Sequence, residues 1–461
     1  MKKVNIATRN KIKFIDLFAG IGGIRCGFEK AAQKFGVETE CVFTSEIKPY
    51  AVEVLKQNYP NEIISGDITQ ISSSEIPDFD LLFGGFPCQS FSAAGKRLGF
   101  LDTRGTLFFE IERILRDKKP FGFILENVEG LINHDRIDKK EKIGRTLSTI
   151  LERLDELGYK VEWKLLNSKH FGLPQERKRV YIVGTKIEKP SLENFNKSYS
   201  KLKSVLEEGH PTIKTKFIQL LLSHYSVDQL YGKSIKDKRG GKNNIHSWDI
   251  ELKGAVSEDQ KKLLNALFKE RRKKKWAEEF GIDWMDGMPL TLNQISTFYK
   301  HENLKDLLED LVKKGYLKKE HPKRLMKEKN LLGEIKTFRQ QDINLPLGYN
   351  IVSGKLSFEV NKILCPNDLA PTLVAMDMKK LFVVDNGGLR TLTLKEGLKM
   401  FGFPENYKFN IGVDEGYDLL GNTVTVPIVE AVSERILTIW DKQKTKQYES
   451  NSTRSFQQVN A

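Results

Sequence analysis

The first 185 residues alternate short apolar runs with stretches whose apolar side chains recur at helical spacing. The apolar runs predict buried strands at Phe14–Leu17, Cys41–Thr44, Leu81–Phe83, Phe123–Leu125 and Val180–Val183. Strands that alternate with helices are typical of an open α/β sheet, whose ligands bind at its carboxyl edge. We therefore expect an α/β fold with functional residues where the strands end.

The pattern changes after Thr185, where lysine-rich helical stretches and polar loops replace the alternation of strands and helices. Near Pro371 the chain becomes compact and apolar again, and it stays so until about Trp440. We therefore predict a catalytic domain over residues 1–185, a second, smaller domain over 186–370, a segment over 371–440 that returns to the first domain, and a polar tail over 441–461.

Composition and charge limit the classes of protein. Apolar residues make up 39% of the 461, enough for a sizeable core, and a formal charge of +14 with a pI near 9.2 favours a polyanionic partner such as nucleic acid. No run of about 18 apolar residues occurs and the first residues lack the apolar core of a signal peptide, so we expect a cytoplasmic protein with no membrane partner. The four cysteines form no CxxC pair and the seven histidines show no ligand spacing, so we expect neither a disulfide nor a metal.

A ligand-binding crevice is predicted where the first strand runs into the glycines Gly20, Gly22 and Gly23. Glycines let the backbone approach a ligand closely, although this spacing is not the GxGxxG fingerprint and a tight turn alone would also explain it. Glu46 follows the second strand, where a carboxylate can accept both hydroxyls of a ribose, and Asp67 ends the third unit, where it can accept an adenine amino proton. Two acids in register with a glycine turn favour a nucleoside ligand.

A candidate nucleophile, Cys88, lies in the loop after the strand at 81–83. Most cysteines are inert, buried apolar residues. This loop is instead built of glycine, proline and polar residues, a setting in which a thiolate can be exposed and stabilised. We therefore predict that Cys88 is reactive.

Several segments together resemble the DNA (cytosine-5) methyltransferases in motif, order and spacing. They are Phe86–Ser92, Asp102–Phe109, Glu126–Val128, Gln175–Arg179, Arg390–Glu396 and Gly421–Val424. The resemblance covers residues 14–184 and about 370–435, and the region between them corresponds only in position to the family's variable target-recognition region.

The resemblance implies a Rossmann-like sheet of the S-adenosylmethionine-dependent methyltransferase type, with a second, smaller target-recognition domain. It implies S-adenosyl-L-methionine as cofactor, double-stranded DNA as partner, and transfer of a methyl group to C5 of a flipped cytosine. A compact chain with one large recognition region resembles the prokaryotic modification enzymes of restriction-modification systems. We accordingly expect a nucleoid-associated, monomeric protein, with a cognate restriction endonuclease acting on the same site as a possible companion.

The chemistry of this reaction accounts for the residue types. Cytosine C5 is a poor nucleophile, so a thiolate must first add to C6 while N3 takes up the developing negative charge. Cys88 and Glu126 fit these two roles, and burial at the end of a strand should raise the pKa of Glu126, unless a backbone cap satisfies its carboxylate. Arg177 and Arg179 alternate along a predicted strand, so both can reach the base carbonyl and nearby phosphates, although an exposed strand also carries arginines. The resemblance assigns the base O2 to Arg179, with Arg177 close by.

The resemblance also assigns the cofactor contacts. It places Phe18 near the adenine, Glu46 at the ribose and Asp67 at the adenine amine, with Pro87 and Asn422 completing the pocket. The further cofactor-binding positions that it implies are Gly20, Gly22, Gly23, Ile47, Ile68, Leu107 and Val424. Residues 89–106, which carry glycines and basic side chains, are predicted to form a mobile lid that closes on DNA.

The second domain gives patterns rather than motifs. Leu304–Val312 has the apolar spacing of an amphipathic helix, closed by Gly315 and followed by the basic Tyr316–Lys319. A helix followed by a basic hairpin resembles a winged helix, but a plain packed helix with a solvated charged strand accounts for the pattern slightly better. The basic run Lys269–Lys275 is either a solvated helix face or a phosphate-binding surface, and its place in this domain favours DNA.

Two other functions fit parts of the sequence. An RNA cytosine-5 methyltransferase acting on tRNA would use the same chemistry, but the large recognition region argues against it. A catalytically silent DNA-binding regulator would not need Cys88, Glu126, Arg177 and Arg179 together.

Overall fold

The computed structural model describes residues 11–86, 107–136, 138, 140–237, 243–329, 335–352 and 358–459. Pro87, Cys88 and the predicted lid over 89–106 lie outside the described residues. The chain folds into two compact units. The first holds Met1–Glu207, Cys365–Lys379 and Leu392–Ala461, and the second holds Glu208–Leu364 and Lys380–Thr391.

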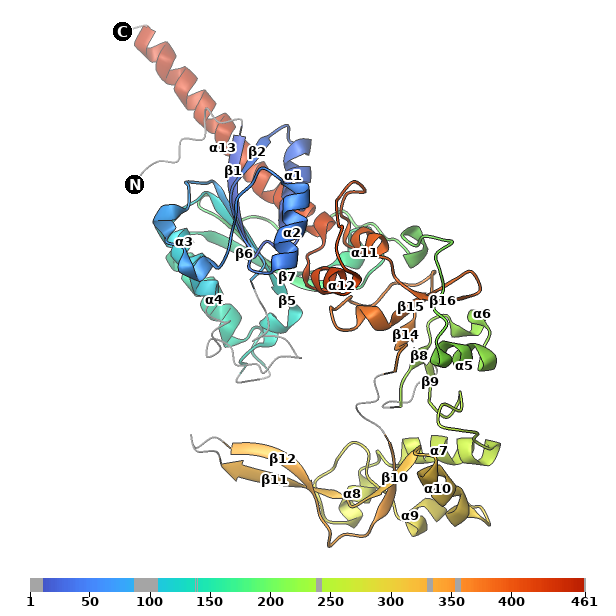
Figure 1. Ribbon diagram of the computed structural model, residues 1–461. Coiled ribbons are helices and arrows are strands. Elements are labelled where there is room, and N and C mark those ends of the chain that lie inside the picture. The colour runs from blue at the N-terminus through green and yellow to red at the C-terminus, as the bar shows by residue number, and fades with distance from the viewer. Residues whose placement is uncertain are drawn as a thin grey trace. The chain divides into compact units, whose positions relative to one another are not determined.

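The first unit is built on a seven-stranded sheet in the order β3-β2-β1-β4-β5-β7-β6 (Figure 1). Its strands are β1 (Lys11–Leu17), β2 (Glu38–Ser45), β3 (Ile64–Ser65), β4 (Leu81–Gly84), β5 (Gly122–Val128), β6 (Lys160–Asn167) and β7 (Lys178–Thr185). Neighbouring strands from β3 to β5 are parallel, whereas β7 is antiparallel to both β5 and β6. The predicted α/β sheet is confirmed, and the five predicted strands lie within β1, β2, β4, β5 and β7.

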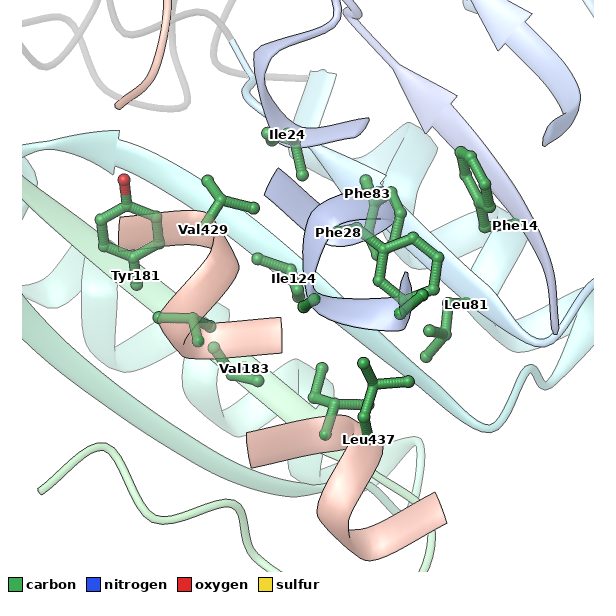
Figure 2. Packing of buried hydrophobic residues seen from close by; sticks show 14 of the residues in the cluster. Phe14, Ile24, Phe28, Leu81, Phe83, Ile124, Tyr181, Val183, Val429 and Leu437 are labelled. Carbon is green, nitrogen blue, oxygen red and sulfur yellow. The ribbon is translucent and has the colours of Figure 1, made fainter. Parts of the chain in front are cut away.

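The first unit also contains helices, several of which cover the two faces of this sheet. They are α1 (Gly23–Lys34), α2 (Pro49–Asn58), α3 (Leu107–Lys118), α4 (Arg145–Glu156), α11 (Leu394–Phe401), α12 (Val413–Asn422) and α13 (Val426–Val459), with short 3-10 helices η1 (Ile68–Gln70), η2 (Ser73–Glu75), η4 (Glu129–Asn133), η5 (Ser168–His170) and η6 (Leu202–Ser204). Successive strand residues point to opposite faces. Phe14 and Phe83 therefore pack with Phe28 of α1 and with α13 (Figure 2), while Ile15 and Leu82 pack under α3 and α4.

Helices α1 and α13 pack closely because α1 carries a glycine where they meet. A Cβ at Gly27 would lie 2.6 Å from the Cβ of Val429 and 2.8 Å from the carbonyl oxygen of Val426. Helix α13 extends to Val459, so most of the segment predicted as a polar tail over 441–461 continues a helix. No proline or glycine interrupts this segment, and its residues are compatible with a helix.

The boundaries of the units differ from those predicted because of specific contacts. Residues 186–207 belong to the first unit, since Leu192 is buried in its core, the Leu202 amide donates to the Asp368 carbonyl (3.1 Å) and Glu207 pairs with Lys399 (3.2 Å). The second unit therefore starts at Glu208 rather than at 186.

The second unit contains a five-stranded sheet in the order β16-β15-β14-β8-β9, which explains why residues 380–391 belong to it. These strands are β8 (Ser234–Ile235), β9 (Asn244–Ile245), β14 (Lys362–Ile363), β15 (Leu381–Asp385) and β16 (Gly388–Thr391), preceded by α5 (Lys216–His224) and α6 (Val227–Leu230). The 3-10 helix η7 (Met378–Lys380) leads into β15.

A helical cluster forms the other part of the second unit. It contains α7 (Glu258–Glu270), α8 (Lys275–Glu279), α9 (Leu292–Ser296), α10 (Leu304–Lys313) and the paired strands β10 (Leu317–Glu320) with β13 (Gly348–Ile351) and β11 (Lys323–Lys329) with β12 (Ile335–Gln341). The predicted amphipathic helix is confirmed as α10, which buries Leu304, Leu308 and Leu311 in one core. No helix among the described residues is long and apolar enough to cross a membrane.

Candidate active site

A pocket of about 260 Å³ lies at the carboxyl edge of the sheet in the first unit. Segments after β1, β2, β3 and β4 and the end of β5 line it, together with α12 and the residues that follow α12. Because β7 is antiparallel to β5, its amino end meets the same edge and brings two arginines there. The predicted residues that line the pocket are Phe18, Gly20, Gly23, Glu46, Ile47, Asp67, Ile68, Leu107, Glu126, Arg177, Arg179, Asn422 and Val424.

Three predicted residues are not among the pocket residues. Gly22 lies in the same turn, but a Cβ there would face Leu55 and Tyr59 of the adjoining helix region. Pro87 and Cys88 lie outside the described residues. Gly85 and Phe86, which directly precede them in the sequence, do line the pocket.

The turn between β1 and α1 holds its shape through left-handed backbone conformations. Phe18, Gly20 and Gly22 have φ angles of 55°, 55° and 70°. Glycine adopts such angles freely, whereas a phenylalanine there is strained by about 1–3 kcal/mol. Gly23 is required for a different reason, since a Cβ would lie 2.8 Å from Cγ2 of Val424. The turn thus places the Phe18 side chain and the backbone of the glycines Gly20 and Gly23 in the pocket lining.

The carboxylate of Glu46 binds the turn itself. One oxygen accepts the Gly20 amide (2.8 Å), and the other accepts the amides of Ile47 (2.9 Å) and Lys48 (2.8 Å). A carboxylate has about four lone-pair sites. Glu46 therefore has room for about one further donor, which is fewer than the two ribose hydroxyls expected from the sequence.

Asp67 is an exposed residue of the pocket lining at the start of η1. Its Oδ1 accepts the Thr69 amide (2.9 Å) and so caps this short helix. Within the described residues no donor is recorded at its second oxygen. Asp67 can therefore cap η1 and still accept a ligand proton.

Glu126 and Arg179, which both line the pocket, form a largely buried pair. Arg179 Nε lies 3.1 Å from Glu126 Oε1, and both side chains are largely shielded from solvent. Burial raises the pKa of the Glu126 carboxyl above its usual value, and the charges of Arg179 and Arg177 offset this rise only in part. The predicted direction of the pKa shift is confirmed, and no backbone cap within the described residues holds the carboxylate.

The guanidinium of Arg177 is bound to backbone rather than open to a ligand. It donates to the carbonyls of Leu373 (2.9 Å), Gly421 (3.1 Å) and Thr423 (2.7 Å), and it is 1% exposed. These carbonyls belong to the returning C-terminal segments. Arg177 therefore ties those segments to the end of the sheet, a role that the alternation of arginines in the sequence did not reveal.

Two further polar residues shape the pocket without having been singled out from the sequence. The buried Asn127 amide donates to the Phe86 carbonyl (3.3 Å), which fixes the chain just before the Cys88 segment begins. Asp418 accepts hydrogen bonds from Lys48 (2.7 Å), Tyr50 (2.6 Å) and Asn422 (3.1 Å). Burial opposes ionisation of Asp418, but the bonds from Lys48 and Tyr50 outweigh it, so the pKa of its carboxyl lies below the usual value.

The spacing of Asp418 and Asn422, four residues apart, was the one sequence signal that could have suggested their contact. Nothing in the sequence places Lys48 beside them. Among the described residues, no three His, Cys, Asp or Glu side chains are arranged to hold a metal ion.

Comparison with known proteins gives close matches along most of the chain. Residues 12–438 match the family model described as C-5 cytosine-specific DNA methylase. The Type II methyltransferase M.NlaIV of Neisseria lactamica is 64% identical over 93% of this chain and 99% of its own length. M.NgoBV of Neisseria gonorrhoeae is 63% identical over the same shares, and M.BanI of Aneurinibacillus aneurinilyticus is 42% identical over 92% and 95%.

Proposed function

The chain belongs to the C-5 cytosine-specific DNA methylase family, a family of methyltransferases, and from this premise we propose how its pocket acts. We propose that it transfers a methyl group from S-adenosyl-L-methionine to C5 of a cytosine flipped out of duplex DNA, with Cys88 as the nucleophile. The main support is that one pocket joins the glycine turn and both acids of the predicted nucleoside site with the Glu126–Arg179 pair.

The residues present fit S-adenosyl-L-methionine at one end of this pocket. Asp67 offers a carboxylate oxygen to an adenine amine, the Phe18 ring offers a stacking surface, and Glu46 has room for about one ribose hydroxyl. Gly20 leaves open space for a close backbone approach, since a Cβ there would meet nothing within 4 Å. The cofactor, when bound, supplies an electrophilic methyl group.

The other end of the pocket suits the reacting base. The Cys88 thiolate forms a bond to C6, and the electron pair displaced from the C5–C6 double bond is drawn toward N3. Burial raises the pKa of the Glu126 carboxyl above its usual value, which favours the protonated form that can share its proton with N3. Once C5 carries the methyl group, a base removes the C5 proton, the double bond re-forms and the thiolate leaves.

The two arginines have separate roles in this proposal. Arg179 orients the Glu126 carboxyl through Nε and is the residue that contacts the base O2. Arg177 is a positioning residue, because its guanidinium holds three carbonyls of the returning segments that include Gly421 and Thr423 of the pocket wall.

We further propose that the second unit recognises the DNA sequence and that the chain protects that sequence from a cognate restriction endonuclease. Relatives at 64% and 63% identity are named Type II methyltransferases. These near full-length relatives favour DNA over tRNA as substrate.

The proposal is tested by trapping on duplex DNA that contains 5-fluorocytosine. Fluorine at C5 cannot leave as a cation, so the covalent intermediate should survive denaturation. Cys88→Ala should abolish the adduct. An adduct that persists in this variant would refute the nucleophile, and one that forms on tRNA but on no duplex would refute the substrate.

The other cysteines provide matched controls. Burial raises the pKa of Cys26 to about 11 and that of Cys41 to about 12, so these thiols stay protonated near neutral pH. Single substitutions of Cys26, Cys41 and Cys365 by alanine should each leave trapping intact.

A further inference from the structure

The second unit carries an antiparallel ribbon of two strands that extends beyond its helices α7 to α10 (Figure 1). Strands β11 and β12 pair from Lys323 with Gln341 to Lys329 with Ile335. At about 3.4 Å per residue, seven residues span about 24 Å. The sequences KRLMKEK and IKTFRQQ contain six basic residues and one acidic residue, so the ribbon has a strong positive charge.

The register divides the described side chains of the ribbon between two faces. Arg324 lies opposite Gln340 and Met326 lies opposite Phe338, so these four residues share one face, called here the Arg324 face. Met326 is 41% exposed and Phe338 is 38% exposed. Leu325 on the opposite face is 37% exposed, so exposed apolar side chains on both faces indicate that a partner covers the ribbon.

The opposite face is held at its base by the body of the unit. Arg339 on that face donates to the carbonyls of Asp283 (3.3 Å) and Trp284 (2.8 Å). The Trp284 indole in turn donates to the Arg272 carbonyl (3.0 Å). These bonds orient the ribbon and leave the Arg324 face turned away from the 283–284 loop.

Arg324 is itself oriented within its face. Its Nε donates to the Asp342 carboxylate, while 47% of the arginine side chain is exposed. The Arg324 hydrogen bond holds the pKa of Asp342 below its usual value, so the pair stays charged at neutral pH. A guanidinium fixed through Nε can direct its outer edge at a planar acceptor.

We propose that the Arg324 face enters the major groove of the target duplex and reads base edges there. This inference rests on the proposed function. A two-stranded ribbon fits a groove about 12 Å wide, and the side chains match the contacts that distinguish bases there: Arg with guanine, Gln with adenine, and apolar groups with the thymine methyl. Phosphates flank the groove, which accounts for the basic charge of the ribbon.

The other basic feature of the unit is less suited to this role. In the run Lys269–Lys275, Arg271 is buried and bound to Asn350 (2.6 Å), Arg272 pairs with Asp286, and Lys273 and Lys275 both approach Glu270. Asp286 and Glu270 offset two of the six positive charges in this run and Arg271 is buried, whereas Lys327 on the ribbon has no ion pair with any described residue.

The test is the sequence preference of full-length variants on a library of degenerate duplexes, read by bisulfite sequencing after methylation. Arg324→Ala and Gln340→Ala should each relax the preference at one position of the site, by roughly 10-fold to 100-fold. Asp342→Asn should relax the sequence preference at the same position as Arg324→Ala does, but to a smaller extent, because the guanidinium of Arg324 remains. Thermal melting and cofactor binding should match wild type.

Two substitutions on the opposite face serve as controls. Lys327→Ala removes the same charge as Arg324→Ala, and Thr337→Ala truncates a residue of the same strand as Gln340. Both should leave the sequence preference unchanged, with at most a uniform loss of affinity and a salt slope lower by about 1 for the lysine.

The outcomes separate the inference from the function on which it rests. Wild-type protein that methylates no duplex in the library would refute the proposed function. A wild-type protein that methylates a defined site, with that site unaltered in Arg324→Ala and Gln340→Ala, would refute only the inference. Equal effects of Arg324→Ala and Lys327→Ala without any change in preference would also overturn it, because the ribbon would then contact phosphates alone.

Discussion

Asn422 and Asp418 lie one turn apart on α12, and the Asn422 amide donates to both the backbone carbonyl (2.8 Å) and the carboxylate (3.1 Å) of Asp418. The same carboxylate binds Lys48 and Tyr50, which lie after β2. One side chain therefore joins two walls of the proposed cofactor site that are far apart in sequence.

Asp418→Ala should raise the KM for S-adenosyl-L-methionine while leaving kcat nearly unchanged. The variant frees Asn422 and Lys48 from their common partner but removes no group proposed to touch the base. Loss of a hydrogen bond to a charged group typically costs on the order of 1.5–3 kcal/mol. We expect the loss of cofactor-binding free energy to lie at the low end of this range, because the Lys48–Asp418 pair is partly exposed. Asp414→Asn, an exposed acid on the same helix, is the control. A fall in kcat at constant KM would contradict the positioning role.

Asp67→Asn should weaken binding of S-adenosyl-L-methionine more than binding of DNA. Asparagine keeps an oxygen to cap the Thr69 amide, so this substitution tests the ligand contact rather than the fold of η1. Isothermal titration should show a loss on the order of 1.5–3 kcal/mol. Unchanged cofactor affinity in the folded variant would reject the adenine contact.

The raised pKa of Glu126 predicts that activity falls as the pH rises through that pKa, because the carboxyl must hold a proton to share with N3. Glu126→Gln should be much slower and should lose this dependence. Rates of methyl transfer between pH 5 and 9 check it, and an alkaline limb that persists in Glu126→Gln would assign the titration to another group.

The same shift has a consequence for stability. The folded protein keeps the Glu126 proton to a higher pH than the unfolded chain does. The contribution of Glu126 to the free energy of unfolding is therefore complete below its ordinary pKa of 4.5, and it is lost as the pH rises through the folded-state pKa. Glu126→Gln should therefore gain stability relative to wild type over that window, by about 1.4 kcal/mol per unit of pKa difference. Urea unfolding at several pH values measures the difference in the free energy of unfolding between the variant and wild type. A difference that does not change with pH would contradict the burial effect.

Arg177→Ala should destabilise the first unit, because three buried carbonyls lose their charged donor. A cost on the order of 3 kcal/mol is expected. Arg179→Ala, which removes a contact to Glu126, should cost less stability and more activity. Arg177→Ala should therefore have the lower denaturant midpoint, and Arg179→Ala should have the lower rate of methyl transfer. An Arg177→Ala protein as stable as wild type would show that the guanidinium does not stabilise the returning segments.

Affinity for nonspecific duplex should fall steeply with salt. Replacing Lys273, Lys274 and Lys275 by alanine should lower the slope of log affinity against log salt by less than three, because Glu270 already pairs with two of these lysines. Fluorescence anisotropy at several salt concentrations measures this slope. No change at all would make the run a solvated helix face.

The sequence predicted β1, β4, β5 and β7 because they are mostly buried and their apolar runs are continuous. It also found β2, which is only partly buried, because Cys41–Phe43 is an unbroken apolar run. It missed β6, since this edge strand, with the sequence KVEWKLLN, alternates polar and apolar residues and is only half-buried over most of its length. It also placed the first boundary at 186, because the polar stretch up to Glu207 is held by contacts to residues near 368 and 399 that no local pattern reveals.

The candidate site shows the same division. Residues tied to strand ends, such as Glu46, Asp67 and Glu126, could be found because the chain order of an α/β sheet fixes where strand ends meet. The hydrogen-bond partners of the site residues within the protein could not be predicted from the sequence. The three amides on Glu46 and the three carbonyls on Arg177 depend on the conformation of a turn and on segments nearly 200 residues away or more.

The packing of α13 against α1 and the sheet has a consequence for synthesis. Helix α13 covers the core cluster that contains Phe28 of α1 and Ile124 of β5. These apolar residues therefore lack their cover until α13 has left the ribosome. The second unit, encoded in between, can complete its own cores earlier. All residues of the second unit are therefore synthesised before the pocket walls at Gly421–Val424 exist, and a chain that ends before these residues cannot have a complete pocket.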